Sequence, residues 1–243
     1  MIDCPNCREP MAAQPTPSFG AVPRDIEVDA CTSCNLFWFD RAESMALTPQ
    51  AVLSLFRLVG EASAARTPLH DAMTCPRCRH SLAFTHDIQR RTRFTYWRCT
   101  SGDGQLITFG QFLAAKDLIR PPSAEELARL RATVRSVNCS QCGAPVDLAT
   151  SSACAHCGAA IMLIDPDSIA KALKELESAA GNGASPPVGA ASAEAARTAM
   201  TNAQIDALFD LERTRERDEH HGDLLAIGAH AIGAALGAFF ALR

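Results

Sequence analysis

Residues 31–40, Cys-Thr-Ser-Cys-Asn-Leu-Phe-Trp-Phe-Asp, join a pair of cysteines to an apolar strand, and this combination decides the fold. Two residues between two cysteines form a tight turn that brings both sulfurs onto one tetrahedral metal ion. A matching pair, Cys4 and Cys7, stands earlier in the chain, with 23 residues between Cys7 and Cys31. The alternation of polar and apolar residues over 25–29 predicts a strand that leads into the second pair. These residues therefore predict a β-ribbon held together by a metal ion.

The 11 cysteines of this 243-residue chain fall into three successive clusters of this kind. The predicted ligands are Cys4, Cys7, Cys31 and Cys34 in the first cluster, Cys75, Cys78, Cys99 and Asp103 in the second, and Cys139, Cys142, Cys154 and Cys157 in the third. An odd cysteine count, and a start that lacks a basic segment followed by an apolar one, favour thiolate ligands in a reducing compartment over disulfides. Zn²⁺ is the expected ion, and iron in the third cluster is the alternative because spacing does not separate the two metals.

Each cluster closes a segment too short to be stabilised by apolar burial alone, whereas structural zinc contributes about 10–16 kcal/mol of apparent binding free energy in small ribbons. The predicted fold is a small metal-stabilised α+β protein, with three successive zinc-ribbon-like β modules joined by helices and a C-terminal helical tail. Because each cluster closes locally, we expect separate modules rather than one core. The predicted segments are ribbon one with its helix (1–60), ribbon two with its helix (66–120), a helical spacer (121–137), ribbon three (138–165), a helix (166–180), a flexible linker (181–192), a polar helix (193–222) and an apolar helix (223–243).

The first ribbon resembles a known bacterial family. Its Cys-Pro-x-Cys turn, strand, Cys-x-x-Cys turn, aromatic pair and acidic residues Asp40 and Glu43 are similar to the bacterial zinc-ribbon domains called transcription factor IIB-type zinc fingers. The resemblance covers residues 2–50 and implies a zinc-bound ribbon without a known enzymatic activity. Where the family has Gly-Gly after the last cysteine, this chain has Asn35-Leu36. We expect Asp40 and Glu43 to cap the helix that follows rather than to act as catalytic carboxylates.

The second ribbon departs from the pattern of the first. Residues 84–99 predict a hairpin, but Gly102 stands in the returning turn where a second cysteine is expected. Asp103 is the nearest oxygen donor that can complete the site. Similar bacterial proteins with several ribbons commonly have a histidine between the two glycines at this point. Nitrogen donors that can complete the site instead are His70, His80 and His86. A site that binds no metal, or binds it weakly, is the remaining alternative.

The second ribbon also concentrates basic charge, although the whole chain has a formal net charge of −4. Its arginines are Arg77, Arg79, Arg90, Arg91, Arg93 and Arg98. Because aromatic residues are interleaved with them, this hairpin can contact phosphates and stack on bases. The alternative is that the arginines balance the negative charge of a thiolate-rich metal site. We therefore expect a protein partner and keep nucleic acid as a possibility.

The third ribbon and the tail complete the prediction. Gly143 and Gly158 each follow a cysteine pair. A residue free to adopt positive φ at this position lets backbone amides face the sulfurs. This ribbon resembles short rubredoxin-like zinc ribbons.

Residues 224–242, which begin at Leu224 and end at Leu242, carry no formal charge and match the thickness of a bilayer as a helix of about 28 Å. A stripe of small residues that can bring two helices together consists of Ala229, Gly233, Gly237 and Ala241.

These patterns predict a non-enzymatic zinc-binding adaptor or regulatory protein that presents its ribbons to a protein or nucleic-acid partner. We expect cytoplasmic ribbons attached to the inner membrane by a C-terminal single-pass helix, with helix packing in a soluble homo-oligomer as the alternative. The alternative function is a metal-dependent or redox protein. It would use the incomplete second site or, as in rubredoxin-like electron transfer, an iron-loaded third site.

Overall fold

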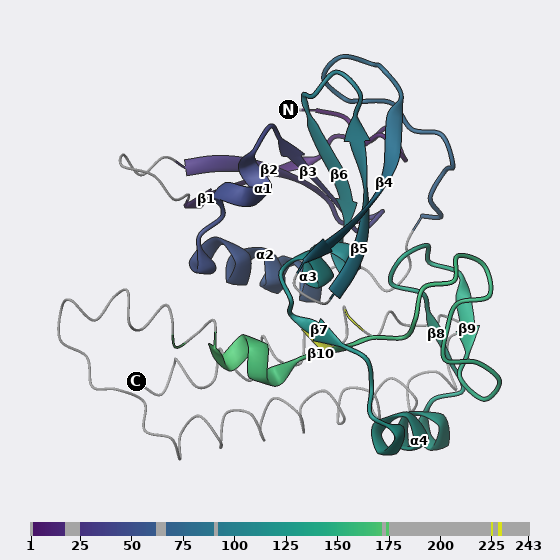
Figure 1. The fold of residues 1–243 in the computed structure, drawn as a ribbon. Helices are drawn as coiled ribbons and strands as arrows, with labels where there is room; N and C mark the ends of the chain where they lie inside the picture. The colour runs from purple at the N-terminus through teal and green to yellow at the C-terminus, as the bar shows by residue number, and fades with distance from the viewer. Residues whose placement is uncertain are drawn as a thin grey trace.

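The computed structural model describes residues 2–17, 25–61, 67–89 and 92–171, together with Lys174, Leu225, Gly228 and Ala229 (Figure 1). The strands are β1 (Ala12–Pro17), β2 (Asp25–Cys31), β3 (Leu36–Asp40), β4 (Leu82–Gln89), β5 (Thr92–Cys99), β6 (Gly104–Thr108), β7 (Ile119–Arg120), β8 (Ser136–Asn138), β9 (Pro145–Asp147) and β10 (Leu163–Ile164). The helices are α1 (Glu43–Ala46), α2 (Pro49–Glu61), α3 (Phe109–Ala115) and α4 (Ala124–Thr133), and residues 166–171 are also helical.

A six-stranded antiparallel sheet, in the order β1-β2-β3-β6-β5-β4, forms the centre of the fold. The first ribbon supplies β1 to β3 and the second supplies β4 to β6. The two ribbons join where β3 pairs with β6, from Leu36 opposite Thr108 to Asp40 opposite Gly104. The prediction of separate modules is therefore wrong for the first two ribbons. The pairing of β3 with β6 joins one edge strand of each three-stranded ribbon, so that β1 and β4 remain as the two edges of the sheet.

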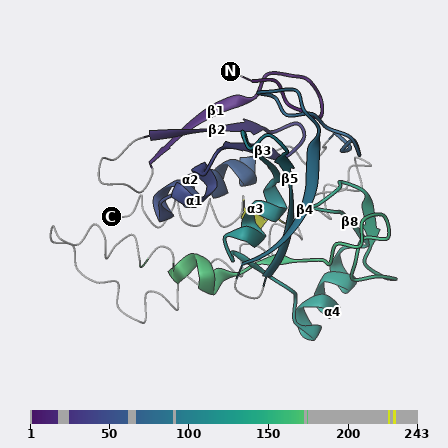
Figure 2. The same cartoon turned by 45° about the horizontal axis from the view of Figure 1, so that its top comes forward.

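The two faces of this sheet carry different cores because successive side chains of a strand point in opposite directions. On one face, Phe37 and Phe39 pack with α2 and α3, and the ring of Phe37 stacks on that of Phe109 at a centroid distance of 4.2 Å. Figure 2 shows these helices covering this face of the sheet. On the other face, Trp38 and Leu106 pack with the cysteines of the first two clusters. The two clusters therefore share one hydrophobic core.

The third ribbon has a core of its own, which includes Leu130 of α4, Val134 directly after it, and the paired Val137 and Val146 of the β8–β9 hairpin. A capping box begins α4, since the Ser123 hydroxyl accepts from the Glu126 N–H while the Glu126 carboxylate accepts from the Ser123 N–H. A short pairing of β7 with β10 then returns the chain to the core of the sheet.

Most of the predicted tail lies outside the described residues. The helix predicted over 166–180 is confirmed as far as residue 171, while the linker over 181–192 and the polar helix over 193–222 are not described at all. Among the described residues, none of the helices has both the length and the apolar character needed to cross a bilayer. Of the apolar stretch, Leu225 and Ala229 are buried in the same core as α3.

Candidate metal centres

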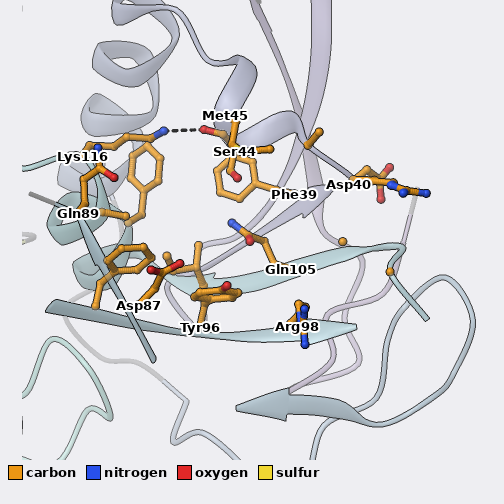
Figure 3. Close-up of a pocket in the computed structure, with 18 of the residues that line it drawn as sticks. Phe39, Asp40, Ser44, Met45, Asp87, Gln89, Tyr96, Arg98, Gln105 and Lys116 are labelled. Carbon is orange, nitrogen blue, oxygen red and sulfur yellow. Dashed lines mark hydrogen bonds between the residues drawn. The ribbon is translucent and has the colours of Figure 1, made fainter. Parts of the chain in front are cut away.

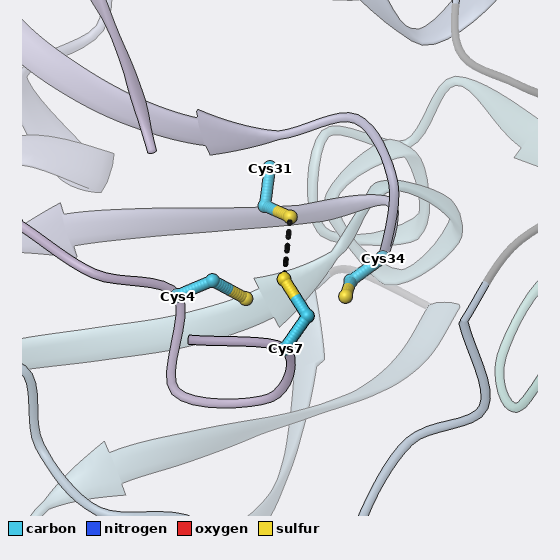
Figure 4. Close-up of side chains that lie close together, drawn as sticks. All are labelled: Cys4, Cys7, Cys31 and Cys34. Carbon is cyan, nitrogen blue, oxygen red and sulfur yellow. Dashed lines mark hydrogen bonds between the residues drawn. The ribbon is translucent and has the colours of Figure 1, made fainter. Parts of the chain in front are cut away.

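The first cluster brings four cysteine sulfurs together at the junction of the first turn, the end of β2 and the start of β3 (Figure 4). All four sulfurs lie within 4.8 Å of one another, and those of Cys7 and Cys31 are 3.7 Å apart. Sulfurs bound to one tetrahedral ion at about 2.3 Å are separated by about 3.8 Å. The four thiols are therefore already spaced for one metal ion, and all 11 cysteines of the chain are free rather than disulfide-bonded.

The leading turns of the three clusters share one local geometry. In the first, the Cys4 N–H donates to the Glu9 carbonyl at 2.8 Å and the Asn6 N–H donates to the Cys4 sulfur at 3.4 Å. The backbone N–H groups of Arg77 and Gln141 make the same 3.4 Å contact with the first sulfur of their own turns. The residues that follow cysteine pairs at positive φ are Arg8 (68°), Asn35 (54°), Arg79 (66°), Gly143 (80°) and Gly158 (74°). These turns direct backbone amides at the sulfurs and so stabilise thiolates.

Asn35 follows the last cysteine of the first cluster in the left-handed backbone region. It is buried with φ of 54°, and its carbonyl accepts from the Phe109 N–H at 2.8 Å. Asparagine tolerates the left-handed region better than most residues with a side chain. The turn after Cys34 therefore forms without a glycine.

The thiols of the first cluster differ in pKa because they hydrogen-bond to one another. Hydrogen bonds from Cys31 and then Cys4 lower the pKa of Cys34 well below its usual range, and the Asn6 side-chain amide also donates to this sulfur at 3.3 Å. The pKa of Cys4 is raised, first by its hydrogen bonds with Cys31 and Cys34 and then by burial. Because metal ligands must be deprotonated, metal binding at this cluster would release the protons that its thiols carry.

The second cluster combines three sulfurs with a carboxylate, as the sequence predicts. The sulfurs of Cys78 and Cys99 are 3.5 Å apart, and Oδ2 of Asp103 lies 3.3 Å from the Cys99 sulfur and 3.7 Å from that of Cys75. The four ligand atoms lie within 4.8 Å of one another. Hydrogen bonds from the thiols, that of Cys78 first, lower the pKa of Asp103. This donor set matches zinc, which accepts both sulfur and carboxylate oxygen.

The returning turn explains why Asp103 and not residue 102 reaches the site. In the first cluster the ligand Cys34 comes before the left-handed residue Asn35, whereas in the second the left-handed residue Gly102, with φ of 85°, comes first. Asp103 follows it and points its carboxylate at the sulfurs. The turn therefore keeps its length and exchanges the positions of ligand and left-handed residue.

The three histidines considered as ligands have different surroundings. His80 lies beside the cluster, with Nδ1 3.3 Å from the Cys78 sulfur and 3.1 Å from the Ser101 hydroxyl, but it is not in the four-atom group. His70 donates its backbone N–H to the Asn6 side chain at 2.8 Å. His86 packs edge-on against the Phe84 ring. The structure therefore brings Asp103, and not a histidine, into the second ligand set.

The third cluster has four sulfurs, as predicted. The sulfurs of Cys139 and Cys157 are 3.6 Å apart and those of Cys142 and Cys154 are 3.7 Å apart. Burial of its sulfur raises the pKa of Cys157 to about 11, although the residue as a whole is exposed at the edge of the cluster. His156, between Cys154 and Cys157 in the sequence, is exposed and is not in the four-sulfur group.

The third residue of each leading turn also ties its cluster to another part of the molecule, a feature that the sequence analysis missed. These residues are Asn6, Arg77 and Gln141, whose backbone amides contact the ligand sulfurs. Their side-chain partners are Pro68 and His70 for Asn6, Asp40 for Arg77, and Thr95 and Thr108 for Gln141. Closure of a cluster and packing of its neighbouring segments are therefore coupled through one residue.

Asp40 and Glu43 do not cap the helix that follows, so this prediction is wrong. Helix α1 begins after Ala42, which has φ of 68° and no capping side chain. Asp40 instead forms two hydrogen bonds with the Arg77 guanidinium, at 3.0 and 2.7 Å, and Glu43 accepts from the Asp40 N–H at 2.8 Å. Arg77 also lies 3.6 Å from the buried carboxylate of Asp29, whose pKa is raised by its burial. An arginine from the second ribbon thus neutralises acids of the first.

The basic hairpin is confirmed as β4 paired with β5, but its aromatic residues do not form an open surface. Trp97 is buried in the core shared by the first two clusters, while Phe94 and Tyr96 pack against the opposite core. Of the arginines considered for nucleic acid, Arg77 forms ion pairs with Asp29 and Asp40, although its side chain is 39% accessible. Arg79, Arg93 and Arg98 are also exposed, while Arg90 and Arg91 lie outside the described residues.

Comparison of the chain with models of protein families, with curated proteins and with solved structures gives no match. The fold and the clusters define a small α+β protein with a mostly antiparallel sheet and three groups of side chains that can bind metal ions. The likeness to transcription factor IIB-type zinc fingers stays a prediction that rests on the residues of the first ribbon.

Proposed function

We propose that the chain is a non-enzymatic adaptor in which zinc ions at the three clusters fix the shape of a protein-binding surface. The observation that carries this proposal is the complete donor set of each cluster, with four ligand atoms within 4.8 Å of one another. Catalytic zinc keeps one position for water or substrate, whereas structural zinc is closed by four protein ligands. Four donors per cluster support a structural role for the metal at all three.

The two edges of the central sheet differ in a way that points to the binding surface. Edge strand β1 contains Pro15 and Pro17, which have no backbone N–H to offer a partner strand. Edge strand β4 contains no proline and exposes Phe84 and Ile88, which are 51% and 57% accessible. An exposed strand edge with apolar side chains favours the addition of a strand from another chain. We name this surface the β4 edge.

Charge supports one kind of partner for the β4 edge. Arg93 lies opposite Ile88 and Arg98 lies opposite Ala83 on the neighbouring strand, and both arginines are exposed. The occupant that we propose is an extended protein segment with alternating apolar residues and acidic flanks. Nucleic acid fits this surface less well, because base stacking requires accessible rings. Among the Phe, Tyr and Trp residues of β4 and β5, Phe84 alone is exposed, while Phe94 and Tyr96 are half-buried and Trp97 is buried.

The test compares Ile88→Lys with Met45→Lys, which changes an equally apolar and even more exposed residue on α1. Tagged full-length proteins are used to capture partners from cell extract with membranes retained, and binding to the captured partner is then measured with purified components. We expect Ile88→Lys to reduce affinity at least about tenfold and Met45→Lys to leave it unchanged. Equal affinities of the two variants would contradict the proposal. So would salt-dependent binding of the chain to single- or double-stranded DNA that Arg93→Gln weakens.

Attachment to the inner membrane is the second part of the proposal, and it rests on the apolar sequence of residues 224–242. Burial of Leu225 and Ala229 in the core of the sheet supports the alternative, in which this segment packs against protein. Deletion of residues 224–243, followed by cell fractionation, separates the two. A tether predicts that the deletion moves the protein from the membrane to the soluble fraction. A full-length protein found only in the soluble fraction would contradict the tether. It would favour the alternative, in which residues 224–242 pack against protein.

Electron transfer at the third cluster is the second candidate function, because Cys157 is exposed and gives a bound iron access to a partner. Metal analysis and absorption spectroscopy of the purified chain distinguish the two functions. The adaptor predicts colourless protein with zinc, whereas an iron site with four thiolates absorbs visible light. Visible absorption that disappears in Cys157→Ser would support electron transfer instead.

A further inference from the structure

A cavity of about 700 Å³ lies beside the central sheet, on the face that carries α1 and α3. Figure 3 shows its arrangement: Lys116 and Gln89 lie at one end, Arg98 and Asp40 lie toward the other, and Gln105 of β6 lies between. None of the predicted metal ligands lines this cavity. It is therefore distinct from the three clusters.

Four aromatic rings are among the residues that line the cavity. Phe39 of β3 stacks on Phe112 of α3 with ring centroids 5.8 Å apart, but each of these rings is only 1% accessible. Phe94 and Tyr96 of β5, which stack on each other at 5.9 Å, are only partly buried. Ligand pockets of roughly 300–1,000 Å³ with aromatic walls and a few polar groups commonly bury small organic molecules.

Lys116 gives the cavity an ammonium group with spare donors. Its Nζ donates to the Ser44 carbonyl at 2.6 Å and lies 5.9 Å from the centre of the Phe112 ring. An ammonium group has three N–H donors, so this hydrogen bond leaves others for a ligand. Burial lowers the pKa of Lys116 to about 8, so the amine is still largely protonated at neutral pH.

The other charged groups around the cavity leave Lys116 without a carboxylate partner within the part of the chain that the structure describes. No ion pair found there includes Lys116. Asp40 is held by Arg77, and Asp117 accepts from the Thr92 hydroxyl at 3.0 Å. Asp87 also lines the cavity, as do Arg41 and Arg98, so acidic and basic side chains are both present around it.

We propose that this cavity binds a small aromatic carboxylate, whose single negative charge meets the Lys116 ammonium while its ring packs against the partly buried Phe94 and Tyr96. A charged hydrogen bond in a partly buried site is stronger than one in water, which gives the carboxylate an advantage over a neutral amide of the same shape. Gln105 supplies a polar group in the middle of the cavity for a further substituent.

The test measures dissociation constants of 3-phenylpropionate and of the matched neutral 3-phenylpropanamide for the full-length zinc-loaded chain by ligand-observed NMR. We expect the acid to bind about tenfold more tightly than the amide. Lys116→Met should remove this difference by weakening the acid alone. Lys171→Met, which changes an exposed lysine on the helix over 166–171, is the matched control and should preserve it.

A second variant keeps the test decisive if Lys116→Met loosens the fold, since the Lys116–Ser44 hydrogen bond joins residues that are 72 apart in the sequence. Ser44→Trp introduces a large ring from α1, a helix without buried residues, and should block binding of both probes while thermal unfolding stays unchanged. Three results would overturn the proposal: no binding of the acid at millimolar concentration, equal dissociation constants for acid and amide, or unaltered acid binding in a folded Ser44→Trp protein.

Discussion

The two halves of the central sheet follow one plan and differ at one ligand. Each half consists of a leading turn, a hairpin, a returning turn, a third strand and a helical segment. Matching hydrogen bonds recur, such as Met11 N–H to the Ile2 carbonyl at 2.9 Å and Leu82 N–H to the Met73 carbonyl at 3.0 Å. The halves meet where β3 pairs with β6, so the sheet has an approximate two-fold arrangement about this pairing.

The two halves differ in the fourth ligand of their clusters. Cys34 is fully buried and supplies a thiolate, whereas Asp103 is only partly buried and supplies a carboxylate. Thiolates suit zinc better than carboxylates do, and a buried ligand is shielded from competing water. We therefore expect a bound ion to leave the second site more readily than the first.

The largest effect that we expect follows from Cys34→Ser. Removal of one thiolate from the buried first cluster should lower the zinc content and the free energy of unfolding, the latter by about 4 kcal/mol. The matched change at the second site, Asp103→Ser, should cost less than half as much. Metal analysis and denaturant unfolding followed by tryptophan fluorescence measure both quantities. Equal losses for the two variants would contradict the difference between the sites.

A substitution at Gly104 should destabilise the pairing of β3 with β6, through which the two halves meet. A methyl group at this position would collide with the Phe39 carbonyl oxygen and lie 2.8 Å from the Trp38 ring. Gly104→Ala should therefore lower the free energy of unfolding by about 3 kcal/mol, as overpacking does in a tight core. Gly102→Ala is the control, because it meets no atom within 4 Å but has φ of 85°, and should cost about 1 kcal/mol. Similar losses in the free energy of unfolding for the two variants would argue against close packing of β3 on β6 at Gly104.

Arg77 joins the leading turn of the second cluster to acidic residues of the first half. We expect its removal to have the third-largest effect on the free energy of unfolding. Arg77→Met leaves the buried Asp29 without its cation and should cost about 2 kcal/mol in the free energy of unfolding. Addition of Asp29→Asn should recover part of this loss. Arg79→Met, at an exposed residue two positions further on, should change stability by less than about 0.5 kcal/mol. A loss for Arg79→Met as large as that for Arg77→Met would show that the ion pairs are unimportant.

Lys116 gives the smallest expected effect, since its amine crosses from α3 of the second half to the Ser44 carbonyl of the first. Its pKa is lowered to about 8 by burial, so between pH 8 and pH 10 the unfolded chain binds more protons than the folded one. The free energy of unfolding should therefore rise with pH in this interval, relative to that of Lys116→Met. Because the residue is only half-buried, we expect this rise in the free energy of unfolding to be about 1 kcal/mol. Denaturant unfolding of both proteins across this interval measures the difference, and parallel pH profiles would contradict a buried amine.

The metal ligands could be predicted from the sequence because each cluster closes through short segments whose spacing is fixed by the turn. Even Asp103 was accessible to this reasoning, since it stands next to the missing cysteine. The pairing of β3 with β6 could not be predicted, because it joins segments about 70 residues apart and the sequence of neither strand identifies its partner. The ion pair of Asp40 with Arg77 depends on that pairing, which is why helix capping was the wrong prediction for Asp40.

Stepwise release of zinc tests the central claim most directly. The purified chain is mixed with a chromogenic chelator, and the number of ions released and the rate of each step are followed beside native mass spectrometry. We predict three zinc ions per chain, one of which leaves at least about tenfold faster than the others and is the ion missing from Asp103→Ala. Three ions released at one rate, or a fast step that persists in Asp103→Ala, would contradict an account built on two four-sulfur sites and one site completed by a carboxylate.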